Sequence, residues 1–214
     1  MRKNLIFLGP PGCGKGTQST VLSLIPGYIK LSTGDLFRNI AKQGNELGEK
    51  IKSILAQGNL VNDDLVNKTI DDFYSKVPQN KIIVLDGYPR SVIQAEELDR
   101  ILNKYKAEVN EVFYFDVSDE VLIKRITGRF TCKDCNRIYN KFFYTTKILG
   151  QCDQCGGKDF NRRDDDSREV LVNRLDVFRK TTRPLLEYYD KKLININADK
   201  SAHEVSEQIM KFLV

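Results

Sequence analysis

The stretch Gly9-Pro10-Pro11-Gly12-Cys13-Gly14-Lys15-Gly16-Thr17 decides how the rest of the chain is interpreted. It follows an apolar run at residues 3–8 that predicts a buried strand, and it precedes residues 18–24, which can continue as a helix. Glycines at a strand-to-helix turn let backbone amides close around an anion, and a helix N-terminus adds the positive end of its dipole. Lys15 adds a charge that can reach terminal phosphates. The stretch therefore predicts a phosphate-binding loop rather than a Gly/Pro-rich surface turn.

One position departs from the usual pattern G-x-x-x-x-G-K-[ST]. Gly16 takes the place of the hydroxyl residue and Thr17 comes one residue late, so a direct hydroxyl ligand to magnesium is open to question. Asp86 ends an apolar run at residues 81–85, where a carboxylate can hold magnesium directly or through water. A plain turn residue is the alternative, but the following Gly87-Tyr88-Pro89-Arg90 fixes a turn and presents a guanidinium, which favours the magnesium interpretation.

Composition limits the function classes. The 214 residues are 41% hydrophobic and 29% charged, which suits one α/β domain with small insertions. The net charge of +5 suits anionic substrates but is too weak and dispersed to indicate nucleic acid. No apolar run approaches a membrane span, and no secretory signal precedes the first strand. We therefore expect no membrane partner and a cytoplasmic location, or an organelle after cleavage of a leader.

Strands and helices alternate along most of the sequence. Strands are expected at residues 3–8, 28–31, 81–85, 112–116 and 193–196, with helices at 18–24, 47–56, 91–104, 118–128 and 202–213 and others opening at Ser32 and Asn62. The alternation predicts a parallel five-stranded sheet covered by helices, with ligands at the carboxyl ends of the strands. Residues 164–167 should open a further long helix, which Pro184 should kink or end near Arg183.

Two stretches interrupt this alternation. Residues 32–61 hold two short helices and form a small helical insert. Residues 130–160 have no helical period but contain cysteines, glycines and aromatic residues, so they form a second, β-rich insert.

The second insert contains Cys132-x-x-Cys135 and Cys152-x-x-Cys155, separated by sixteen residues. This is the four-cysteine zinc spacing, and with no open position the metal should be structural. Redox chemistry is disfavoured by the two matched pairs, and nucleic-acid binding by the acids at positions 134, 153, 159 and 164–166; zinc and iron are not distinguished. The fifth cysteine, Cys13, is left over and fills a small-residue position in the phosphate loop, although a thiol at a helix N-terminus can be unusually acidic.

Five arginines lie at the edges of loops or inserts: Arg38, Arg90, Arg129, Arg163 and Arg174. A single arginine is more often a solvated surface charge, but the group suits phosphoryl transfer, which needs positioning and positive charge around the moving phosphoryl group. No nucleophile–base pair is evident. His203 is the only histidine and lies far in sequence from every motif.

Together these motifs resemble one family, adenylate kinase, in its long form with a zinc-binding lid. The resemblance covers essentially the whole chain, and the family shares the departure at Gly16. It rests on the phosphate loop, Ser32-Thr33-Gly34-Asp35, Asp86-Gly87-Tyr88-Pro89-Arg90, Arg125-x-x-Gly128-Arg129, the cysteine pairs, and Arg163-x-Asp165-Asp166 through Arg174.

The resemblance implies a role for each matching position. It implies catalytic roles for Lys15, Arg90, Arg129, Arg163 and Arg174, magnesium binding through water at Asp86, and metal binding at Cys132, Cys135, Cys152 and Cys155. ATP would contact Gly12, Cys13, Gly14, Lys15, Gly16, Thr17, Arg129, Ile138, Tyr139 and Lys200. AMP would contact Thr33, Arg38, Asn59, Leu60, Val61, Gly87, Tyr88, Pro89, Arg90, Gln94, Arg163 and Arg174.

The resemblance also implies a division of the chain and a reaction. A kinase core at residues 1–31, 62–128 and 167–214 would carry an AMP-binding insert at 32–61 and a zinc-binding lid at 129–166. The reaction would be reversible transfer from MgATP to AMP, giving two ADP, by a monomer that holds Mg²⁺ with ATP and a structural Zn²⁺. Three alternatives stay open: a sister nucleoside monophosphate kinase with another acceptor or GTP as donor, a nucleotide-binding switch protein, and a zinc-ribbon nucleic-acid binder.

Overall fold

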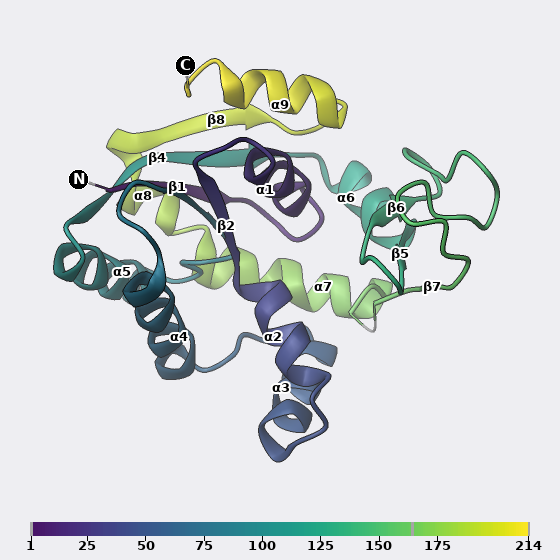
Figure 1. The fold of residues 1–214 in the computed structure, drawn as a ribbon, viewed down its shortest axis with the longest axis horizontal. Coiled ribbons are helices and arrows are strands. Elements are labelled where there is room, and N and C mark those ends of the chain that lie inside the picture. Colours follow the sequence, from purple (N-terminus) through teal and green to yellow (C-terminus); the bar gives the residue numbers. More distant parts are fainter. Residues whose placement is uncertain (1, 164, 214) are drawn as a thin grey trace.

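The computed structural model describes residues 2–163 and 165–213. A parallel sheet at its centre has the strand order β2-β3-β1-β4-β8. The strands are β1 (Arg2–Leu8), β2 (Tyr28–Ser32), β3 (Ile82–Asp86), β4 (Ala107–Asp116) and β8 (Leu193–Asn197). The predicted parallel five-stranded sheet is therefore confirmed, and Figure 1 shows helices on both of its faces.

Successive side chains of each strand point to opposite faces of the sheet, so the hydrophobic core has two parts. Ile6 and Leu8 of β1 belong to the part covered by α4 (Asp63–Lys76), α5 (Val92–Lys104) and α8 (Leu185–Tyr188). Leu5 and Phe7 belong to the opposite part, under α1 (Lys15–Ser23), α6 (Asp119–Thr127) and α9 (Ala202–Met210). Because both faces of the sheet are buried, the central strands β1 and β3 contain continuous apolar runs at residues 5–8 and 82–85, and polar side chains such as Asp86 come at the carboxyl end.

Short polar side chains begin most helices within a residue or two of the predicted positions. Ser32 accepts a hydrogen bond from the backbone N–H of Asp35 and caps α2 (Thr33–Ala41). Asn45 caps α3 (Glu46–Ala56) in the same way, and α2 and α3 pack on each other to form the helical insert. Ser201 and Glu204 form a reciprocal capping box at the start of α9.

The starts of two elements differ from prediction by more than a residue or two, and α9 ends at Met210 rather than at residue 213. β4 begins at Ala107 rather than at residue 112. The polar residues at 108, 110 and 111 gave no strand signal, but this part of β4 pairs with β1, with a register shift after Asn4. α1 begins at Lys15 rather than at residue 18, because Gly14 adopts a left-handed φ of 106° and serves as the N-cap.

Pro184 interrupts a long helical path, as predicted. α7 (Arg168–Val177), capped by Ser167, widens into a π-helical turn (Phe178–Thr182) before α8 begins. The backbone N–H of Arg183 bonds to the carbonyl of Phe178 at 2.9 Å, five residues back. Such widening suits a proline ring, which obstructs the carbonyl four residues before it. Asp164, predicted to help open this helix, lies outside the described residues.

A second, antiparallel sheet lies in the β-rich insert, beside α6 in Figure 1. Its strands are β5 (Arg129–Cys132), β6 (Ile138–Asn140) and β7 (Phe160–Asn161), in the order β6-β5-β7. A short 3₁₀ turn (Asp190–Lys192) leads into β8. Among the helices of the described chain, none is long and apolar enough to cross a membrane.

Candidate active site

The loop between β1 and α1 has the conformation that phosphate binding requires. Gly12 has a φ of 84°, and a Cβ there would lie 2.7 Å from Cγ1 of Ile126 in α6. Gly14 has a φ of 106° and caps α1 without a side-chain hydrogen bond. The first turn of α1 is therefore free of any side-chain cap, and its amide groups and dipole can serve an anion.

Lys15 lies across this loop. Its Nζ donates to the carbonyl oxygens of Gly9 at 2.6 Å and Pro10 at 3.0 Å, and lies 3.2 Å from Sγ of Cys13. The buried Cys13 side chain fills a small slot, as predicted from its position in the loop. The ammonium of Lys15 is therefore held against the backbone of the loop.

Asp86 ends β3 beside the loop and is only 8% exposed. Its Oδ2 accepts a hydrogen bond from Oγ of Ser19 at 3.1 Å. The same oxygen lies close to Gly16 of the loop, because a Cβ added to Gly16 would be 3.4 Å from it. The hydroxyl that reaches this carboxylate is thus Ser19, a residue the sequence motif did not single out, whereas Thr17 is exposed. Carboxylate and hydroxyl oxygens are ligands that suit Mg²⁺.

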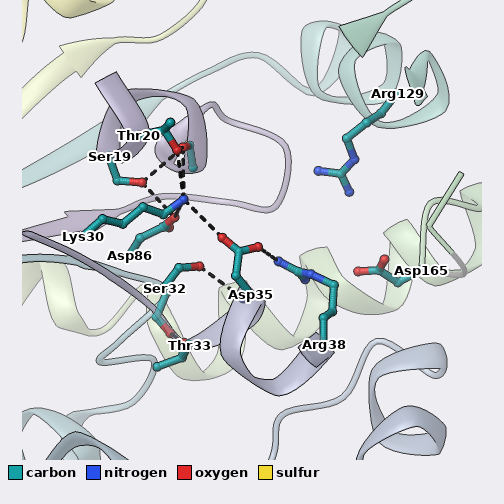
Figure 2. Close-up of polar contacts among 12 residues, drawn as sticks. Ser19, Thr20, Lys30, Ser32, Thr33, Asp35, Arg38, Asp86, Arg129 and Asp165 are labelled. Carbon is teal, nitrogen blue, oxygen red and sulfur yellow. Dashed lines mark hydrogen bonds and ion pairs between the residues drawn. The ribbon is translucent and has the colours of Figure 1, made fainter. Parts of the chain in front are cut away.

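Lys30 of β2 reaches the same carboxylate and was not predicted. Figure 2 shows its ammonium between Asp86 and Asp35, at 4.0 Å and 3.1 Å from their Oδ2 atoms. Burial would raise the pKa of Asp35, but Arg38 and Lys30 together hold it well below its usual range. A lysine on an edge strand gives no sequence signal that separates it from a surface charge.

The five predicted arginines are close enough for their charges to repel one another. Burial, followed by the charges of Arg129 and Arg38, lowers the pKa of Arg163 to about 9. Burial and then Arg174 lower the pKa of Arg90 to about 10, with a smaller contribution from Arg38. Five guanidinium groups from separate parts of the chain therefore converge on one region, which is the electrostatic signature of an anion site.

Two acids hold part of this cluster in place. Arg129 makes a two-point ion pair with Asp166, with 2.7 Å between Nε and Oδ2. Arg174 donates to Oδ2 of Asp165 at 2.8 Å, and Figure 2 shows Arg129 and Asp165 across the site from Lys30 and Asp86. The sequence placed these acids in a family motif and at a helix start, but it did not predict their ion pairs with Arg129 and Arg174.

The turn after β3 is packed tightly around Gly87. Its carbonyl accepts hydrogen bonds from Oγ1 of Thr33 at 2.8 Å and Nε of Arg90 at 2.7 Å. With a φ of 80°, Gly87 would place a Cβ 2.9 Å from a guanidinium nitrogen of Arg90, so a side chain is excluded. The Tyr88 and Pro89 side chains are buried, which leaves only their backbone for a ligand.

Gln94 lies against this turn and is 2% exposed. Its Nε2 donates to Asp63 at 2.6 Å, and its Oε1 accepts from the backbone N–H of Arg90 at 2.7 Å. Both the Nε2 and the Oε1 of Gln94 thus have hydrogen-bond partners within the protein. A nucleotide base would have to share these two atoms with Asp63 and Arg90.

The segment after α3 meets α7 beside the arginine cluster. Oδ1 of Asn59 accepts from Asn173 at 3.3 Å, and a Cβ at Gly58 would lie 2.8 Å from Cγ of Arg174. Val61 is buried, and Leu60 is half-buried. The structure thus brings the end of the helical insert to one of the predicted phosphate-binding arginines.

The two predicted lid residues of β6 differ in exposure. Ile138 is 39% exposed, whereas Tyr139 is 1% exposed and its hydroxyl contacts Sγ of Cys152 at 3.3 Å. The Tyr139 ring also stacks on Phe130, with 5.5 Å between centroids. The Tyr139 side chain is thus part of the interior of the insert, and only its backbone remains available to a nucleotide.

Arg125 joins the phosphate loop to the segment before α9. It donates to the carbonyl of Cys13 and to that of Lys200, each at 3.1 Å. Lys200 itself is exposed, as an adenine contact through its backbone would allow. The position of Arg125 in a family motif was the only sequence signal for this link.

The four cysteines of the second insert form one cluster. Their sulfur atoms all lie within 4.8 Å of one another, with 3.6 Å between Cys132 and Cys155 and 3.5 Å between Cys135 and Cys152. These separations are too long for disulfides, whose sulfurs are about 2.0 Å apart. They are close to the about 3.8 Å edge of a tetrahedron with zinc–sulfur bonds of 2.3 Å.

The two cysteine turns match each other bond for bond. The backbone carbonyl of Cys132 accepts a hydrogen bond from the N–H of Asn136 at 2.9 Å, and the backbone N–H of Cys132 donates to the carbonyl of Arg137 at 3.0 Å. In the second turn, the backbone carbonyl of Cys152 accepts from the N–H of Gly156 at 2.9 Å, and the N–H of Cys152 donates to the carbonyl of Gly157 at 2.8 Å. Asn136 and Gly156 both have a positive φ, of 60° and 77°. Two equivalent turns thus present four thiols to one point.

Comparison with known proteins agrees with this geometry. The family model described as adenylate kinase matches residues 7–194. The chain belongs to the adenylate kinase family. The adenylate kinases of Thermosipho melanesiensis and Borreliella burgdorferi are each 42% identical to it over 212 residues, covering 98% of this chain and 99% and 98% of theirs. That of Methanothrix thermoacetophila is 41% identical over 212 residues, 98% of each chain.

The groups gathered in this region fit the chemistry of the adenylate kinase family. Adenylate kinases use Mg²⁺ with ATP, and the phosphate loop with Asp86 offers groups for such a ligand. The arginine cluster adds positive charge, which suits a family whose members bind ATP, AMP and ADP. The cysteine cluster fits the zinc-binding lid that the sequence suggested.

Proposed function

We propose that this protein transfers the terminal phosphoryl group of MgATP to AMP, reversibly, to give two ADP. The observation that carries the proposal is the convergence of five arginines in front of a phosphate-binding loop. A protein that only binds or hydrolyses a nucleotide triphosphate needs the loop but not this second set of guanidinium groups. Close similarity to adenylate kinases over 98% of the chain supports the same reaction.

The two nucleotides would occupy opposite sides of the arginine cluster. The loop at residues 12–17 would bind the ATP phosphates, with Arg129 and Ile138 above them and the Lys200 backbone at adenine. Thr33, Arg38, residues 59–61, residues 87–90 and Gln94 would bind AMP. Arg163 and Arg174 would lie between the two sets of phosphates. Hydrogen bonds from Thr33 and Arg90 to Gly87 already fix the shape of the AMP side.

The chemistry then requires positioning rather than a nucleophile from the protein. An oxygen of the AMP phosphate forms a bond to the γ-phosphorus, and the bond from that phosphorus to the β–γ bridging oxygen breaks. Lys15 and the arginines stabilise the charge that spreads over the transferred group. Asp165 and Asp166 hold Arg174 and Arg129 in their orientations until phosphate oxygens replace or share those contacts.

Two metals have suitable donors in this chain. Asp86, with Ser19 beside it, would hold Mg²⁺ directly or through water, and bound Mg²⁺ neutralises phosphate charge. Cys132, Cys135, Cys152 and Cys155 would hold Zn²⁺ as a closed, structural site. The insert has a buried cluster of only three residues, so a metal supplies cohesion that burial does not.

The chain would divide by function as well. Residues 1–31, 62–128 and 167–214 form the kinase core, 32–61 the AMP-binding insert and 129–166 the lid. We propose that this unit acts as a monomer, because both nucleotide sites are assembled from one chain; light scattering of the purified protein tests the monomeric state.

A panel of monophosphate acceptors with MgATP tests the function. We expect two ADP to form for each ATP and AMP consumed, and little ATP hydrolysis without an acceptor. Comparable use of UMP or CMP, or preference for GTP as donor, would assign a sister kinase. ATP hydrolysis with no transfer to any acceptor would assign a nucleotide switch.

A further inference from the structure

Among residues 2–163 and 165–213, Lys30 is the one cation that lies within 4.0 Å of both Asp35 and Asp86. It lies on β2, in register with Val84 of β3, and its side chain is 18% exposed. Its Nζ lies 3.1 Å from Oδ2 of Asp35 and 3.1 Å from the Thr20 hydroxyl. The same ammonium lies 3.4 Å from the Gly16 carbonyl and 4.0 Å from Asp86.

The two acids depend on Lys30 to different degrees. Asp35 has a second partner, because Arg38 donates to its Oδ1 at 2.6 Å. Asp86 has no other cation within 4.0 Å in the described part of the chain. Its remaining close partner is the neutral hydroxyl of Ser19 at 3.1 Å. Within the described residues Lys30 is therefore the nearest cation to Asp86, as Figure 2 shows, and Arg90 adds a weaker, more distant attraction.

We propose that Lys30 is a positioning residue that acts as a built-in counter-ion. In the nucleotide-free protein it occupies the space between Asp35 and Asp86 and keeps a divalent cation from binding there; the cation enters together with the nucleotide. This inference rests on the proposed role of Asp86 at the magnesium of MgATP. It adds a residue that controls when magnesium can bind.

Charge repulsion supplies the physical reason. A divalent cation at Asp86 would lie within a few ångströms of the ammonium, where like charges repel strongly outside bulk water. The negative phosphates of ATP offset this repulsion, so Lys30 weakens cation binding to the free protein more than to the nucleotide complex. Lys30 thereby strengthens the coupling between magnesium and ATP, and the coupling is reciprocal.

Titration of nucleotide-free protein with Mn²⁺, followed by electron spin resonance, tests the inference. We expect Lys30→Gln to bind Mn²⁺ about tenfold more tightly than the wild type, because one nearby positive charge is lost. Glutamine can still hydrogen-bond Thr20, which limits structural change. Lys30→Met, which also removes the charge, should show the same gain, whereas Lys30→Arg keeps it and should match the wild type.

Two further variants locate the effect. Lys76→Gln removes a lysine from an exposed ion pair with Asp72 and should leave Mn²⁺ binding unchanged. Asp86→Asn in the Lys30→Gln background should abolish the gain. Unchanged affinity in folded Lys30→Gln and Lys30→Met proteins would overturn the inference, as would a gain that persists without Asp86. No phosphoryl transfer is measured, so failure of the proposed reaction would not imitate either result.

Discussion

Lys15 illustrates how the site is arranged at the level of single residues. Its ammonium is already held by the carbonyls of Gly9 and Pro10, so it meets phosphate without a large movement. We expect Lys15→Ala to lower kcat by about 100-fold or more, the range seen when one charge-stabilising group is removed. Steady-state transfer from ATP to AMP measures the loss, and circular dichroism checks the fold. Lys76→Ala, at an exposed ion pair, is the control; near wild-type turnover in Lys15→Ala would contradict the phosphate-loop assignment.

Gln94 should decide the choice of acceptor base. Its buried amide is bonded to Asp63 and to the backbone of Arg90, so its orientation is fixed before a base binds. We expect AMP to exceed GMP, CMP and UMP widely in kcat/KM, since buried polar groups left unpaired penalise the wrong base. In Gln94→Ala this preference should shrink, and stability should fall by about 1–3 kcal/mol because Asp63 and Arg90 lose a buried partner.

The measurement for Gln94 combines acceptor kinetics with urea unfolding. Exposed Gln57→Ala, whose side chain makes only surface contacts with Ser53 and Asn59, is a matched control. A preference for AMP that survives unchanged in Gln94→Ala would place the discrimination elsewhere on the AMP side.

At the level of elements, the cysteine turns should determine the stability of the lid rather than its chemistry. Four thiols at one point leave no open ligand position, so Cys132→Ser or Cys155→Ser should release the metal and lower Tm. We expect measurable transfer to persist at low temperature. Metal content by mass spectrometry, Tm and activity are measured together, and chelation that removes the ion should act in the same way.

Asp159→Asn serves as the control for the lid. It disrupts an exposed ion pair with Lys133 in the same insert but leaves the cysteines intact, so metal content and Tm should stay near those of the wild type. Purified protein without about one metal per chain under reducing conditions would contradict the closed-site account. So would activity that vanishes with the metal while Tm is unchanged.

The junction between β7 and α7 should make stability depend on pH. Burial would raise the pKa of Asp165, but Arg174 and further arginines lower it below its ordinary value. Because the folded pKa is below the unfolded one, the carboxylate contributes stability above the usual carboxyl range and loses it as the pH falls. Asp165→Asn should therefore lower Tm by about 2–4 °C near pH 7, corresponding to about 1 kcal/mol.

The Tm difference between wild type and Asp165→Asn should shrink below about pH 4, where the carboxyl in the unfolded chain is protonated. Asp72→Asn, at an exposed ion pair with Lys76, should show almost no difference at any pH. A Tm difference for Asp165→Asn that is constant from pH 7 to 3 would mean that lost packing, not charge, causes it.

For the whole molecule, the two inserts should move together when both nucleotide sites are filled. Adenylate kinases are an established case of lid closure, and excluding water protects a phosphoryl group in transit. The arginines proposed to bind the phosphates lie on both inserts and on α7. A phosphate group bound by several of them would therefore bring these parts closer to one another. We expect a smaller radius of gyration by X-ray scattering with AMP plus a non-hydrolysable MgATP analogue than with either alone. Equal values in all three conditions would contradict closure by shared phosphate contacts.

Local sequence determined the elements of this protein. Apolar runs predicted all five strands of the parallel sheet, and short polar residues such as Ser32 and Asn62 predicted helix starts, because both signals act over neighbouring residues. The spacing of the cysteines predicted one cluster, since each turn sets its own geometry. The start of β4 was missed because polar residues precede Val112. Pairing with β1, and not an apolar run, stabilises this first part of the strand.

Only the tertiary structure decided which side chains meet. Ser19 and Lys30 reach Asp86 from α1 and β2, and Arg125 joins the phosphate loop to Lys200, although no spacing in the sequence links these positions. It also turned the Tyr139 ring into the interior of the lid, where Phe130 stacks on it. Such contacts depend on how the crossover connections bring distant segments to one edge of the sheet, which no local propensity specifies.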